Sequence, residues 1–300
     1  MGRRFDGPGQ QVSIGLQTPV DAAAALGAPA PVPTGGAWAL LRRLGITVLA
    51  AGVSLALVVA VWTAFLRLAN VNRLVGKGPM DVWTFLVSAP AAATNRASIA
   101  DALMVTLRHA STGFAAGLLA AVVVAVLFVA MGTVERALMP VAMVVRSVPL
   151  VAMTPLLVLV FGRGLLGVTV IVAVVVFFPA LVTVVFGLRS APAQATDLVR
   201  AYGGGSWTVL RMVALPSALP ALFAAARISV PGAIVGALLA EWLATGTGLG
   251  YQMLKDASTF AYAHLWSSVV VLTVVSVLLY YLVGAVESVV TKRFGVATAR

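Results

Sequence analysis

The sequence has no cysteine and only two histidines among its 300 residues. The absence of cysteine excludes disulfide bonds, thiolate catalysis and thiolate metal ligands. With His109 and His264 as the only imidazoles, a histidine-based metal site is not expected either. We therefore expect no metal and no cofactor in this chain.

Charge is also scarce, because 10% of the residues are charged and 61% are hydrophobic. Soluble domains carry about 25% charged residues. This chain has too few charged residues to form a surface that faces water on all sides, so it requires a lipid bilayer. The net charge of +11 would ordinarily suggest nucleic acid or an anionic surface. Here the cations lie at the ends of apolar runs, so we interpret them as signals of membrane topology and expect no nucleic-acid partner.

Signals for enzymatic chemistry are missing as well. The nearest approach to a phosphate-binding loop runs from Gly162 to Gly167, and it is followed by Val168 and Thr169 where Lys and then Ser or Thr would be required. No Ser/His/Asp order, paired carboxylates or metal-ligand spacing stands out in the apolar runs. We therefore expect neither nucleotide hydrolysis nor another catalytic activity in this chain.

Six apolar runs predict an all-α membrane protein with six transmembrane helices. The first run, Leu44 to Leu66, carries no charge and would be about 34 Å long as a helix, enough to span a bilayer. The segment from Arg67 to Arg108 is too polar to cross and is expected to lie along one face as loop and short amphipathic helix. The other five runs are Ala110 to Thr133, Met139 to Phe161, Leu165 to Leu188, Leu219 to Leu243 and Trp266 to Val286.

Four segments are expected from this pattern. Residues 1–40 are rich in Pro, Gly and Ala and predict a disordered cytoplasmic N-terminal tail. Residues 41–100 hold the first transmembrane helix and an extracytoplasmic segment. Residues 101–294 form a five-helix core with a cytoplasmic loop at 189–216, and residues 295–300 are a C-terminal tail.

Orientation follows from the distribution of Lys and Arg. If both termini are cytoplasmic, eleven of these cations lie inside and six outside, with Arg108, Arg146 and Arg227 in or at the edges of spans. This bias places the segment from Arg189 to Pro216 in the cytoplasm.

The segment from Arg189 to Pro216 is a polar region between two long apolar runs. Asp197 can favour the first turn of a helix, Gly203 permits a left-handed helix stop, and Pro216 suits the start of the next helix. The same features also serve an ordinary loop between two membrane helices, so the segment alone leaves both interpretations open.

The spacing within this segment resembles the EAA signature of permease subunits in ABC importers. Asp197 lies six positions before Gly203, and Val213, which begins the Val-Ala-Leu-Pro run, lies ten positions after it. The sequence departs from the signature in having Asp in place of Glu and Leu-Val in place of Ala-Ala. The resemblance implies a short cytoplasmic helix that docks on a separate ATP-hydrolysing subunit through Asp197, Leu198, Val199, Ala201, Tyr202, Gly203, Gly204, Ser206, Leu215 and Pro216.

Further stretches from Asp101 to Phe294 are similar to type I ABC importer permeases of the nitrate, sulfonate, taurine and thiamine-precursor branch. They are Arg146 to Pro149 with Pro155-Leu156 and Phe161-Gly162, Leu215 to Pro220 with Arg227, and Glu241 with Gly248 to Tyr251. The resemblance implies a MetI-like fold, a homodimer in the bacterial inner membrane, two ATPase subunits and an extracytoplasmic solute-binding protein.

The expected function is therefore ATP-driven import of a small organic or anionic solute. The alternative is a secondary transporter or channel that works alone, although such a protein would be expected to hold more titratable groups at mid-membrane.

Ionisable groups within spans are costly, and each is a functional hypothesis. Arg227 has no obvious acidic partner on its own run, and either an interhelix contact or a pathway-lining role fits it. Glu241 fits either an interfacial position or the pathway, and Met153 and Phe177 are further candidates for the pathway lining. Two glycine pairs spaced four apart, Gly113 with Gly117 and Gly232 with Gly236, would allow helix backbones to approach closely.

Overall fold

The computed structural model describes residues 37–293, so the expected terminal tails lie largely outside the described residues. The chain divides into two compact units, residues 1–61 and residues 62–300. In the first unit the described part belongs to α2, Ala37–Leu68, a continuous helix. Its residues Leu49–Leu68 are long and apolar enough to cross a membrane, as the first apolar run predicted.

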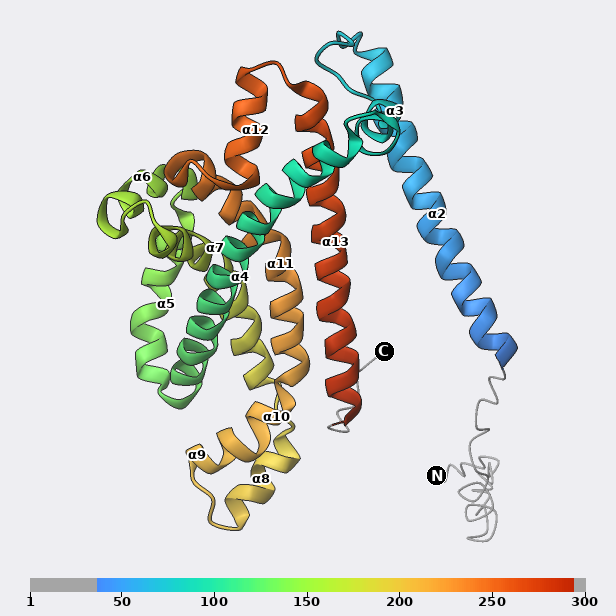
Figure 1. The fold of residues 1–300 in the computed structure, drawn as a ribbon. Helices are drawn as coiled ribbons and strands as arrows, with labels where there is room; N and C mark the ends of the chain where they lie inside the picture. Colours follow the sequence, from blue (N-terminus) through green and yellow to red (C-terminus); the bar gives the residue numbers. More distant parts are fainter. Residues whose placement is uncertain (1–36, 294–300) are drawn as a thin grey trace, which may run out of the picture. The chain divides into compact units, whose positions relative to one another are not determined.

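The second unit is helical throughout its described residues, apart from short connections. Figure 1 shows α4, α7, α11 and α13 side by side, and contacts between them hold this bundle together. Three five-residue stretches are π-helical turns, η1, η2 and η3. The elements are α3 (Pro79–Trp83), η1 (Thr84–Ser88), α4 (Ala92–Ala130), α5 (Gly132–Ser147), α6 (Leu150–Phe161), α7 (Leu165–Arg189), α8 (Ala193–Ala201), α9 (Ser206–Val209), η2 (Leu210–Ala214), α10 (Leu215–Ser217), α11 (Leu219–Ala240), η3 (Glu241–Thr245), α12 (Gly248–Ser258) and α13 (Tyr262–Arg293).

Within the described residues, five helices have the length and apolarity to cross a membrane, and they contain five of the six predicted spans. The third predicted span, Met139 to Phe161, differs, because it is divided between α5 and the shorter α6. Pro149 has no N–H to donate and disfavours helical geometry at the residue before it. Val148 is accordingly extended, with φ −75° and ψ 126°, and the helix breaks there.

The polar segment after the first span also differs from expectation in its second half. From Ala92 onwards it belongs to α4, which continues without interruption into the second predicted span. No glycine or proline occurs between Ala92 and Thr112 to stop the helix. The expected domain boundary near residue 100 therefore falls inside a helix.

The helices α4 and α7 pack closely against each other. A Cβ atom added at Gly113 would lie 2.2 Å from Val172 Cβ, and one added at Gly117 would lie 2.6 Å from the Ala173 carbonyl oxygen. Both glycines are buried, and the packing against α7 requires their lack of a side chain. The first predicted glycine pair is thus a backbone contact, whereas Gly232 of the second pair has ordinary space around it.

Candidate functional site

The polar region between α7 and α11 forms a helical loop at one end of the second unit. Figure 1 shows α8 and α9 where α7 ends and α11 begins, at the end opposite α12. Of the residues predicted to contact an ATPase, four lie in α8, three in the turn after it, one at the start of α9 and two in α10. They are, in that order, Asp197, Leu198, Val199 and Ala201; Tyr202, Gly203 and Gly204; Ser206; and Leu215 and Pro216.

Gly203 ends α8 as the sequence predicted. Its φ of +82° lies in the left-handed region, which costs little for glycine and much for a branched residue. Its N–H donates to the Arg200 carbonyl at 2.9 Å, and the Gly204 N–H donates to the Val199 carbonyl at 2.9 Å. A Cβ at Gly204 would lie 2.5 Å from Val199 Cγ1, so the turn is tightly packed against α8.

The prediction that Asp197 lies in the first turn of its helix is wrong. α8 begins at Ala193 after Pro192, so Asp197 lies in the second turn and is exposed. The sequence argument placed the helix start at the first acidic residue, whereas Pro192 already supplies a suitable start. The carboxylate of Asp197 therefore lies on the outer surface of α8.

The outer surface of this loop carries large apolar side chains. Leu198 is 59% exposed, Trp207 65% and Tyr202 85%. Directly after α9, by contrast, Leu210 and Ala214 of η2 are buried in the core that α4 and α7 form. The loop thus presents an apolar patch outwards while its final turn is anchored in the helix bundle.

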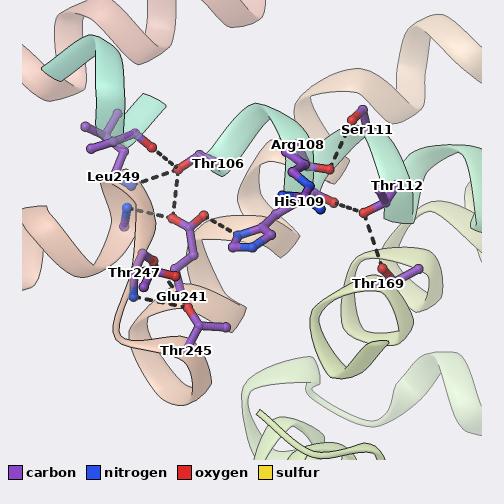
Figure 2. A network of polar contacts seen from close by, with 12 residues as sticks. Thr106, Arg108, His109, Ser111, Thr112, Thr169, Glu241, Thr245, Thr247 and Leu249 are labelled. Carbon is purple, nitrogen blue, oxygen red and sulfur yellow. Dashed lines mark hydrogen bonds and ion pairs between the residues drawn. The ribbon is translucent and has the colours of Figure 1, made fainter. Parts of the chain in front are cut away.

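At the opposite end of the second unit, Glu241 is fully buried in a polar network, shown in Figure 2. Its Oε1 lies 2.8 Å from His109 Nδ1. Its Oε2 accepts hydrogen bonds from Thr106 Oγ1 at 2.9 Å and from the Gly250 N–H at 2.8 Å. Thr106 Oγ1 in turn accepts the Leu249 N–H at 2.8 Å. The network joins α4 to η3 and α12.

The turn between η3 and α12 is shaped to admit this carboxylate. Gly248 has φ +88°, and a Cβ there would lie 2.2 Å from the Glu241 carboxylate. The run Gly-Leu-Gly that the sequence placed with Glu241 is therefore explained by contact with it. The role of His109 was not predicted from the sequence, because histidine was considered there only as a metal ligand. A usable signal was its position three residues after Thr106, on one face of an apolar helix.

Arg227 makes an interhelix contact. Its guanidinium lies 3.3 Å from Glu287 Oε2 on α13 and 5.4 Å from the centre of the Tyr280 ring. A Cβ at Gly284 would lie 3.4 Å from Arg227 Nη1, so this glycine leaves room for the cation. The sequence left two roles open for Arg227, an interhelix contact and a place in the pathway lining. The structure shows the contact, between α11 and α13, and the pathway role stays a prediction.

The two apolar pathway candidates lie in different surroundings. Met153 lines a cavity of about 360 Å³ at the break between α5 and α6, together with Pro149, Phe178 and Pro179. Phe177 instead packs against the buried core that α4 and α7 share, with its ring edge on Phe178. Roles in a pathway for Met153, Phe177 and Glu241 remain predictions.

Several helices of membrane-spanning length, joined by a structured polar loop, define a polytopic membrane protein. Residues 102–296 match the family described as "Binding-protein-dependent transport system inner membrane component". The chain belongs to this family, which confirms the resemblance found in the sequence.

Individual relatives agree with this assignment. A probable ABC transporter permease protein of Haemophilus influenzae is 30% identical over 177 residues, which are 59% of this chain and 72% of that protein. The riboflavin transport system permease protein RibX of Chloroflexus aurantiacus is 32% identical over 158 residues, 53% of this chain and 59% of that protein. Other relatives are named as permeases for formylaminopyrimidine, aliphatic sulfonates, taurine and nitrate.

The fold has a counterpart among solved structures. The inward-facing MetNI methionine ABC transporter contains a chain that matches with a TM-score of 0.50 and 24% identity, over 65% of this chain and 94% of that chain. This likeness confirms the MetI-like permease fold. The chain is thus a membrane permease subunit of the ABC importer type.

Proposed function

We propose that two copies of this chain form the translocation pathway of an ATP-driven importer, with two separate ATPase subunits bound at the loop α8–α9. A solute-binding protein delivers the cargo at the opposite end, where α12 lies. ATP-driven movement of the ATPase subunits displaces α8 and α9, and the bundle opens its cavity alternately to the two sides of the membrane.

The observation that carries this proposal is the construction of the loop. Exposed apolar side chains such as Tyr202 and Trp207 favour a protein partner over water. Because η2 is buried against α4 and α7 and continues through α10 into α11, a push on the loop reaches three helices of the bundle. Such a loop can transmit force, which an ordinary flexible connection cannot.

The proposed orientation puts the loop and both termini in the cytoplasm. The excess of Lys and Arg on that side supports it. In the second unit, the last described turn of α13 lies at the same end as α8 and α9 in Figure 1, which agrees with a cytoplasmic C-terminus.

The cargo is proposed to be a small organic or anionic solute. The relatives' names include a vitamin, a pyrimidine, sulfonates and an inorganic anion, so the family tolerates varied cargo. Selection is assigned to the separate binding protein, because the cavity around Met153 is mainly apolar.

The test compares valine at two glycines of the same loop. Gly203→Val forces a branched residue to φ +82°, whereas Gly205→Val places it at φ −77° and ψ 178°, an extended geometry that valine adopts readily. Neither added Cβ meets an atom within 4 Å, so local backbone geometry is the difference between them. We expect Gly203→Val to reduce transport and co-purification of the ATPase at least tenfold, and Gly205→Val to change both less than twofold.

Substrate uptake into proteoliposomes and ATPase recovery on an affinity column measure the two effects. If Gly203→Val retains both at the wild-type level, α8–α9 does not couple ATP hydrolysis to transport. Uptake by the permease alone, without ATP or a partner, would instead identify a secondary transporter or channel.

A further inference from the structure

One arginine at the edge of the membrane has no acidic partner within residues 37–293. Arg108 is exposed on α4, two positions before the predicted span that begins at Ala110. The described ion pairs instead join Arg189, Arg227 and the two histidines to acids. An ionisable group at membrane depth is costly without a partner and is a functional hypothesis by default.

The acids nearest to Arg108 do not neutralise it. Asp101 lies seven positions earlier on the same helix, about 10 Å along its axis. Glu241 is buried, and both of its carboxylate oxygens already have partners on α4 and α12. Arg108 is therefore free to bind an anion that the described part of the chain does not supply.

Arg108 lines a cavity of about 660 Å³ between α4, α11 and α13, called the α4 groove below. Figure 1 shows α4 running obliquely across α11 and α13. The floor of the groove is apolar and buried, since Ala110 is 6% exposed and Ala233 2%. Its rim is open, since Met104 is 67% exposed and Leu282 59%. The α4 groove is thus a mainly apolar cleft with a cation on its wall.

The α4 groove has the depth of one lipid leaflet. Arg108 precedes His109 on α4, and the His109 ring contacts Glu241, the residue directly after α11 (Figure 2). Val230, which also lines the groove, lies eleven positions before Glu241, or about 16 Å along the helix axis. Half of a hydrocarbon layer is about 15 Å thick. An acyl chain whose headgroup lies at Arg108 would therefore reach Val230.

We propose that the α4 groove binds one anionic phospholipid, with its phosphodiester at Arg108 and an acyl chain between α4, α11 and α13. A guanidinium presents paired N–H donors that match two phosphate oxygens. Pockets between membrane helices that hold a cation are typical sites for anionic lipid headgroups. The proposal goes beyond the proposed function, and neither depends on the other.

Two properties select a phospholipid over a helix of this protein. The sequence of α2 contains no Asp or Glu, so α2 of this chain or of a second copy would leave Arg108 without a counter-charge. At the other end of the groove, about one turn beyond Val230, Arg227 is already paired with Glu287. The groove therefore offers one free cation and otherwise apolar walls, which matches an anionic headgroup with an apolar tail.

The experiment uses the full-length permease, purified in a neutral detergent and titrated with phosphatidylglycerol, phosphatidylethanolamine or glycerol 3-phosphate. Thermal unfolding reports binding, because a ligand of the folded state raises the melting temperature. Native mass spectrometry confirms that the lipid is bound. We expect a half-saturation concentration for phosphatidylglycerol at least fivefold below that for phosphatidylethanolamine, and no shift with glycerol 3-phosphate at the same concentration.

The headgroup contact is tested at Arg108. Arg108→Gln should weaken phosphatidylglycerol binding at least fivefold and phosphatidylethanolamine binding less than twofold, so that the two lipids bind alike. Arg108→Lys keeps the charge and should retain the preference for phosphatidylglycerol. Arg163→Gln, at an exposed arginine in the α6–α7 turn, is the matched control and should leave both lipids within twofold.

The acyl-chain contact is tested at Ser111. Ser111 is exposed and lines the groove, and its hydroxyl donates to the Arg108 carbonyl of its own helix. A ring in Ser111→Phe should take the space of the acyl chain and weaken both lipids at least fivefold. Thr273→Phe is the control, because Thr273 makes the same kind of bond within α13 and does not line the groove.

Equal binding of the two lipids to the wild type, or unchanged phosphatidylglycerol binding to Arg108→Gln, overturns the headgroup site. An equal shift with glycerol 3-phosphate would show a site for free phosphate and would also overturn the lipid proposal. Unchanged lipid binding to Ser111→Phe overturns the place of the acyl chain, including the case in which α2 or a second copy fills the groove. Solute uptake by the wild type with its ATPase decides the proposed function separately.

Discussion

At the scale of single residues, Thr106 is the centre of the buried network. Its hydroxyl donates to Glu241 and accepts from the Leu249 N–H, so one oxygen satisfies two buried groups on different elements. A buried polar group left without a partner costs about 1–3 kcal/mol. The stability of this end of the bundle therefore depends on the Thr106 hydroxyl, which hydropathy along the sequence does not reveal.

Thr106→Val preserves the shape of the side chain and removes the hydroxyl. We predict a loss of about 2 kcal/mol or more in unfolding free energy, because Leu249 N–H and Glu241 Oε2 each lose a partner. Thr273→Val is the matched control, since Thr273 is exposed and bonds only to the Val269 carbonyl of its own helix. Thermal unfolding of the purified permease in detergent measures both. Equal melting temperatures for the two variants would contradict a structural role for the Thr106 hydroxyl.

The sequence identified Glu241 and the Gly-Leu-Gly run of this network and missed Thr106 and His109. Glu241 stood out because an ionisable group in a membrane span is costly, and its combination with the Gly-Leu-Gly run resembles a stretch of the permease family. His109 lies 132 positions away on another helix, and no local pattern reports that the two side chains meet. A separation of 60 positions likewise hid the partner of Arg227, which is Glu287 on α13. Pairings between helices depend on how the bundle packs, which periodicity along one helix does not determine.

At the scale of elements, the contact between α4 and α7 depends on glycine. Gly117→Ala would place Cβ 2.6 Å from the Ala173 carbonyl oxygen and 2.9 Å from Ala173 Cα, so the backbones must separate. Gly232→Ala on α11 meets only Val175 Cγ1, at 3.5 Å, an ordinary contact. Alanine is otherwise favoured over glycine in a helix by about 0.5–1 kcal/mol.

We therefore predict different effects of these two substitutions on stability. Gly117→Ala should lower the melting temperature of the purified permease, and Gly232→Ala should leave it unchanged or raise it slightly. Both are helix-interior glycines, so helix propensity cancels in the comparison and packing decides the sign. A gain in stability for Gly117→Ala would show that α4 and α7 can separate freely.

Helices were predicted correctly where the length of an apolar run is enough to determine the secondary structure. Five of the predicted spans lie within long helices, because a run of twenty apolar residues has few other stable structures in lipid. The third span was not recognised as two helices, because the apolar residues on both sides of the stretch Arg146 to Pro149 were interpreted as one run. The long α4 was underestimated for the converse reason: its first part is polar, yet contacts with η1 and α12 keep it helical.

At the scale of the whole molecule, orientation in the membrane can be read with single cysteines, because the natural chain contains none. Ser206 at the start of α9 and Ser258 at the end of α12 are both exposed. We predict that an impermeant thiol reagent added to intact cells labels Ser258→Cys, and labels Ser206→Cys only after the cells are opened. The permease is expressed without an ATPase, so that no partner covers Ser206. The reverse pattern would place α8–α9 outside the cell and remove the basis of the proposed function.

The break between α5 and α6 has a consequence for the bilayer around the molecule. Counted from Ala137, after the charged residues Glu135 and Arg136, α5 ends about 16 Å along its axis, roughly half of a 30 Å hydrocarbon layer. Pro149 supplies no N–H, and the N–H groups in the first turn of α6 have no partner within that helix, so this stretch of backbone cannot face acyl chains, which offer no hydrogen bonds. Another polypeptide or a water-filled channel must therefore cover this side of the bundle, and lipid can contact the bundle only on its other sides.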